Sequence, residues 1–112
     1  MIYQAIQQDI DLWEAWIEFD PVAQHFFGTL YVMGEVVVDK KSSRPFIGKA
    51  VNENEPHVLI LHLQSPPVSH ANRVTEVMYS ENLKHIDQYR SIKIYKDHEL
   101  LTRITDIETV VS

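Results

Sequence analysis

Six histidines are the side chains best suited to metal binding or acid–base catalysis in this 112-residue sequence. Imidazole is the commonest metal ligand in proteins. Two ligands on one strand share a face only when an even number of positions separates them, but His57 and His62 are five apart. The other four lie near predicted turns. We therefore predict no metal and no cofactor. The alternative is a metal site assembled from several strands, and His62 is the residue most expected to belong to it.

Two pairs of carboxylates have the residue types of a general acid–base pair, Asp9 with Asp11 and Glu14 with Glu18. Hydrolysis by paired carboxylates needs a cleft that holds both groups at a fixed separation, and a domain of this size rarely encloses one. We interpret these acids as solvated side chains on an amphipathic element.

The densest aromatic stretch contains Trp13 and Trp16, with Phe19, Phe26 and Phe27 close behind. Aromatic side chains on a β-surface can stack on sugars or anchor a protein partner. Because an odd number of positions separates the two tryptophans, a strand would point one of them outward, whereas a helix would let both pack in the core. The candidate binding residues are therefore Trp13, Trp16, Glu14 and Glu18.

Most catalytic signatures are missing from the chain. It has no cysteine and three glycines, so it has neither a thiolate site nor a glycine-rich phosphate loop. It also has no Gly-x-Ser-x-Gly and no His-Glu-x-x-His motif. These absences favour a non-catalytic protein over an enzyme.

Charge is distributed unevenly along the chain, whose net charge is −6. Residues 1–39 hold seven acids and no lysine or arginine, and residues 40–112 hold all ten bases with the other nine acids. The cluster from Lys40 to Arg44 is interpreted as a solvated hairpin tip. The N-terminus has no signal-peptide pattern, and the longest apolar run is Val58 to Leu61, too short to cross a membrane. We expect a cytoplasmic protein that contacts no membrane.

Alternating apolar residues between turn signals predict strands, most clearly over Thr29 to Asp39 and His57 to Gln64. Gly34 interrupts the first of these, which indicates a bulge or a close backbone approach. The segment from Leu100 to Val111 changes phase midway, so we expect a bulge near Thr105 and Asp106. The predicted core comprises Leu30, Val32, Val36, Leu59, Leu61, Leu63, Ile92 and Ile94.

Residues 1–20 fit either a helix or a first strand, and we favour a strand from Leu12 to Phe19. The chain is thus predicted to be one domain over residues 1–112, all-β or β with one N-terminal helix. About seven strands with regular turns predict an antiparallel two-sheet sandwich of immunoglobulin-like type, with a partly open β-barrel as the alternative. Tyr89, before the penultimate strand, has the position of a tyrosine corner.

Two function classes remain open. The first is a non-catalytic β-sandwich module that binds a partner protein or forms a homodimer through its acidic, tryptophan-bearing N-terminal segment. The second is a small enzyme or ligand-binding protein with a His/Asp/Glu site assembled across strands.

We expect no specific binding of nucleic acid at physiological salt, because the unbalanced acids in the first third of the chain repel phosphates. A mobility-shift assay at submicromolar protein measures this. A shift that weakens steeply as salt is added would contradict the expectation.

Overall fold

The computed structural model describes residues 13–19, 28–39, 45–51, 54–65 and 72–111. These ranges form eight strands and no helix, so they contain no helix that could span a membrane. The strands are β1 (Glu14–Phe19), β2 (Gly28–Asp39), β3 (Phe46–Ala50), β4 (Val58–Gln64), β5 (Asn72–Asn82), β6 (Ser91–Lys96), β7 (Glu99–Ile104) and β8 (Glu108–Val111).

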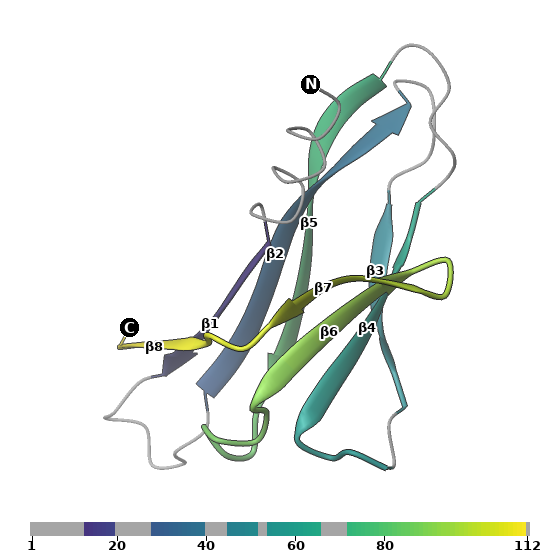
Figure 1. Ribbon diagram of the computed structural model, residues 1–112. Helices are drawn as coiled ribbons and strands as arrows, with labels where there is room; N and C mark the ends of the chain where they lie inside the picture. Colours follow the sequence, from purple (N-terminus) through teal and green to yellow (C-terminus); the bar gives the residue numbers. More distant parts are fainter. Residues whose placement is uncertain (1–12, 20–27, 40–44, 52–53, 66–71, 112) are drawn as a thin grey trace.

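The strands form two packed four-stranded sheets (Figure 1), which confirms the predicted sandwich and not the barrel. The first sheet has the order β5-β2-β1-β8 and the second the order β3-β4-β6-β7. Most strand pairings are antiparallel, as predicted, but both sheets are mixed, because β1 pairs in parallel with β8 and β4 with β6. Between β4 and β6 the chain runs through β5 in the opposite sheet, so it returns in its original direction. The immunoglobulin-like type stays a prediction.

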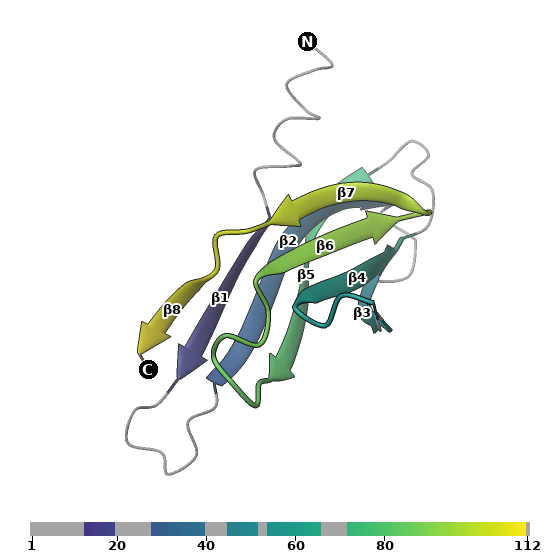
Figure 2. The same ribbon diagram turned by 60° about the horizontal axis from the view of Figure 1, so that its bottom comes forward.

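The end of the chain differs from the predicted single strand. β7 ends at Ile104 in the second sheet, and β8 begins at Glu108 in the first. The phase change near Thr105 and Asp106 is thus a crossover between sheets (Figure 2) rather than a bulge. The irregularity in the β6–β7 pairing lies instead opposite Ile94 and Tyr95.

The N-terminal segment is a strand over Glu14–Phe19, as we favoured, and not a helix. It pairs antiparallel with β2, with Ala15 opposite Val32. The alternation of side chains buries Trp13, Ala15 and Ile17 and turns the residues between them to the outer face. Residues 1–12 and 20, the rest of the ambiguous segment, lie outside the described residues.

The core lies between the two sheets and confirms the predicted set. Seven of those residues are buried, and Val36 is partly buried against them. The first sheet adds Trp13, Ala15, Ile17 and Val77, and the second adds Ile47 and Ile104. Because one parity of β1, β2, β4 and β6 faces the interior, these strands present apolar side chains to the opposite sheet.

Gly34 has the close approach that the sequence indicated. The indole of Trp13 lies directly over its backbone, so that a Cβ added at Gly34 would overlap the ring. Glycine is thus required here because of the space that the tryptophan fills.

Leu61→Ala should lower the free energy of unfolding by about 2–5 kcal/mol, because Leu61 is fully buried and the methyls removed leave a cavity. Denaturant unfolding measures the change. An unchanged midpoint would mean that this face of β4 is not in the core.

Gly34→Ala should cost about 1–3 kcal/mol of stability by overpacking against Trp13. Gly48→Ala is a matched control, since the atoms nearest an added Cβ there belong to the exposed, movable ring of Phe46. In a double-mutant cycle, Trp13→Ala should remove most of the Gly34→Ala penalty. Fully additive losses would show that the two residues do not conflict.

Candidate functional site

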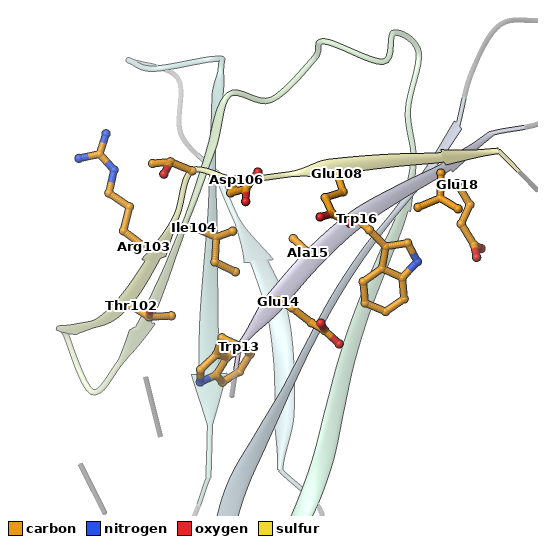
Figure 3. Close-up of a pocket in the computed structure, with 12 residues that line it drawn as sticks. Trp13, Glu14, Ala15, Trp16, Glu18, Thr102, Arg103, Ile104, Asp106 and Glu108 are labelled. Carbon is orange, nitrogen blue, oxygen red and sulfur yellow. The ribbon is translucent and has the colours of Figure 1, made fainter. Parts of the chain in front are cut away.

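Trp16 lies on the outer face of the first sheet, opposite the side that buries Trp13. It pairs across strands with Tyr31, and the two rings stack with centroids 5.5 Å apart at an interplanar angle of 23°. Figure 3 shows the indole between the side chains of Glu14 and Glu18. Because Tyr31 supports one ring face, Trp16 is held in place while it stays partly exposed.

Glutamates occupy outward positions on the same face of the sheet as this aromatic pair. Cross-strand register and alternation place Glu14, Glu18, Glu35, Glu76 and Glu108 there. In the described part of the chain no ion pair links any of them to a basic group. We call this surface the acidic face: these five glutamates, the stacked Trp16 and Tyr31, and the apolar side chains of Met33, Val37, Val74, Met78 and Val110.

Several of these apolar side chains are open to solvent. Val74 is 59% exposed and Met78 52%. They lie on β5, whose outward residues are in register with those of β2. The acidic face therefore combines negative charge with accessible apolar area across all four strands of the sheet.

A cavity of about 670 Å³ opens where the chain crosses from β7 to β8, with β1 as its other wall (Figure 3). All four predicted binding residues line it, together with Ala15. Glu14, Glu18, Asp106 and Glu108 line it, and Arg103, the one basic residue among its described lining residues, has its guanidinium directed away from it (Figure 3). The excess of carboxylates favours a cationic group in this cavity.

The sequence interpretation missed the glutamates that other strands contribute. Glu35, Glu76 and Glu108 are far from Trp16 in sequence, and strand pairing brings them to the same face. The alternation of side chains along its predicted strand was enough to place Glu35 on the outer face. No sequence pattern indicated the position of Glu108, because that position depends on the crossover into β8.

His62 lies on the other side of the molecule, on the outer face of the second sheet. Its ring stacks on that of Tyr95, with centroids 5.7 Å apart. Within the described ranges no group of three or more His, Asp or Glu side chains could hold a metal ion. His25 and His70 lie outside those ranges.

A second polar cluster, which the sequence did not suggest, joins the two sheets around Glu81. The carboxylate accepts hydrogen bonds from the hydroxyls of Tyr79 (2.5 Å) and Tyr89 (2.7 Å) and from the amide of Gln88 (3.3 Å). Lys49 of the second sheet lies 3.2 Å from it and donates to the Tyr89 hydroxyl at 2.9 Å. Tyr89, predicted as a tyrosine corner, thus bonds to a side chain in this cluster.

These contacts change the ionisation of the cluster. Partial burial opposes ionisation of Glu81, but hydrogen bonds from Tyr79, Tyr89 and Lys49 hold its pKa below the usual value. Burial and the neighbouring Glu81 raise the pKa of Tyr79. The hydrogen bond to Tyr89 and the charge of Glu81 raise the pKa of Lys49. At neutral pH the cluster therefore holds an ion pair between Lys49 and Glu81, and the Tyr89 hydroxyl bonds to both of its members.

Comparison with known proteins assigns no family: no family model, no curated protein and no solved structure matches this chain.

Glu81→Gln should lower the free energy of unfolding at pH 7 by about 1–3 kcal/mol, because the charge-assisted hydrogen bonds are lost. Since the folded-state pKa of Glu81 is lowered, its contribution is present above the unfolded-state pKa and is lost as pH falls through the folded-state pKa. The stability gap between wild type and Glu81→Gln should thus narrow in acid. Glu76→Gln, exposed on the same strand, is the control. A gap independent of pH would contradict this role.

Proposed function

We propose that this chain is a non-catalytic β-sandwich module that binds a basic partner protein through its acidic face. The observation that carries the proposal is the stacked Trp16–Tyr31 pair, partly exposed among glutamates that have no basic partner in the described residues. A lysine or arginine side chain of a partner would find an aromatic surface and carboxylates together. That combination favours cations through both the ring quadrupole and direct charge.

The fixed geometry of the face supports binding at a modest entropic cost. Tryptophan and tyrosine present large rigid surfaces with few rotatable bonds, and here the two rings already hold each other in place. Residues of this type dominate the binding energy of protein interfaces. The exposed Val74 and Met78 extend the apolar area beyond the aromatic pair.

The alternative, a small enzyme or ligand-binding protein with a His/Asp/Glu site, depends on the same cavity. Its described lining supplies carboxylates and Arg103 but no imidazole, and His62 lies on the opposite sheet. The geometry therefore supports recognition of a cationic group better than acid–base chemistry. The cytoplasmic location expected from the sequence remains a prediction.

Trp16→Ala should weaken binding of a fluorescent Lys/Val-alternating peptide about tenfold while changing the melting temperature little, since Trp16 is outside the core. Fluorescence anisotropy and thermal unfolding give the paired measurement. The substitution leaves the net charge unchanged, so purely non-specific attraction would not respond to it.

Trp13→Ala is the matched variant on the buried side of β1. It should chiefly destabilise the fold, by about 3–5 kcal/mol, because the Trp13 ring fills the core beside Gly34. If Trp16→Ala instead melts far lower than wild type and binds the peptide equally well, Trp16 is a packing residue and the proposal fails.

A further inference from the structure

The outer face of the second sheet carries a row of aromatic and apolar side chains across its four strands. Gly48, His62, Tyr95 and Leu100 stand opposite one another in register. The ring of Phe46 lies over Gly48, and His62 stacks on Tyr95. Phe46 is 61% exposed and Leu100 51%, so both ends of the row are open to solvent.

The charge of this second surface is opposite to that of the first. Lys93 and Arg103 pair directly across β6 and β7 on the outer side. At the outward positions of β3, β4, β6 and β7, all of which the structure describes, no aspartate or glutamate occurs. We call Phe46, His62, Tyr95, Leu100, Lys93 and Arg103 the basic face.

The two faces lie on opposite sides of the sandwich, because they are the outer surfaces of its two sheets (Figure 2). We propose that the partner of the acidic face is the basic face of a second copy of this chain, an inference that rests on the function proposed above. Two acidic faces would bring five unpaired glutamates against five, so a symmetric contact through that face is electrostatically disfavoured. An acidic face and a basic face have complementary charges, and each face also carries a central aromatic group.

This contact is heterologous, since it joins two different surfaces. Each molecule keeps one free acidic and one free basic face at the ends, so the assembly grows head to tail unless its rotation closes a ring. Self-association should therefore give a concentration-dependent series of masses rather than a single dimer.

Two charge-reversal variants of the full chain separate the faces. Glu14→Lys with Glu108→Lys changes the exposed positions beside Trp16, and Lys93→Glu with Arg103→Glu changes the basic face. Each should weaken self-association at least about tenfold in sedimentation velocity. Asp87→Lys and Lys84→Glu, exposed in the connection between β5 and β6, are controls that shift the net charge in the same two directions, and they should associate like wild type. Circular dichroism confirms that each variant folds.

Mixing the two variants gives the decisive result. One keeps an intact basic face and the other an intact acidic face, so an equimolar mixture should associate, while each variant alone stays monomeric. If the variant with the altered basic face still dimerises alone, the contact is symmetric and the head-to-tail inference is overturned.

The Lys/Val peptide distinguishes this inference from the proposed function. A wild-type protein that stays monomeric up to its solubility limit, yet binds the peptide through Trp16, overturns self-association and leaves the proposed function standing. A protein that neither associates nor binds the peptide contradicts both.

Discussion

The packing of the Trp13 indole on the bare backbone of Gly34 sets the geometry on which the candidate site depends. It seats the start of β1 against β2 with the ring inside the core. Since side chains alternate along a strand, Trp16, three positions on, must then face outward. The register that follows puts Trp16 against Tyr31 and places β8 on the other edge of β1. One core contact thereby determines which tryptophan can reach a partner.

The uneven charge of the sequence becomes a difference between the two sheets. The acid-rich first third supplies β1 and β2, both in the first sheet, whereas every strand of the second sheet comes from later in the chain. β5 and β8 return to the first sheet and add Glu76 and Glu108 to its outer face. Lys93 and Arg103 face outward on the other side. Because charges at such distances are screened within about 8–10 Å at physiological salt, each face acts on what touches it rather than on the opposite face.

Alternation was enough to predict the strands and the core, because parity depends only on local sequence. Leu59, Leu61 and Leu63 are inside for the reason the pattern indicates. The sheet crossings were not predictable in this way, since the phase change near Thr105 is compatible with a bulge or with a crossover. The same limit applied to the site: Trp16, Glu14 and Glu18 were found from one segment, while Glu108 reaches them only through the parallel β1–β8 pairing. The Glu81 cluster joins residues whose spacing carries no pattern.

That cluster has a consequence for the two faces. Lys49 belongs to the second sheet and Glu81 to the first, and Tyr89, from the connection into β6, bonds to both. Apolar contact between sheets is non-directional and would tolerate small sliding of one sheet on the other. Hydrogen bonds to a carboxylate have directional requirements, so the cluster restricts this sliding at the edge where β3 contacts β5. A head-to-tail assembly transmits the relative orientation of the two outer faces from each copy to the next. A substitution that removes the hydrogen bonds of the Glu81 cluster would therefore make the relative orientation of neighbouring copies less well defined, even where both faces remain intact.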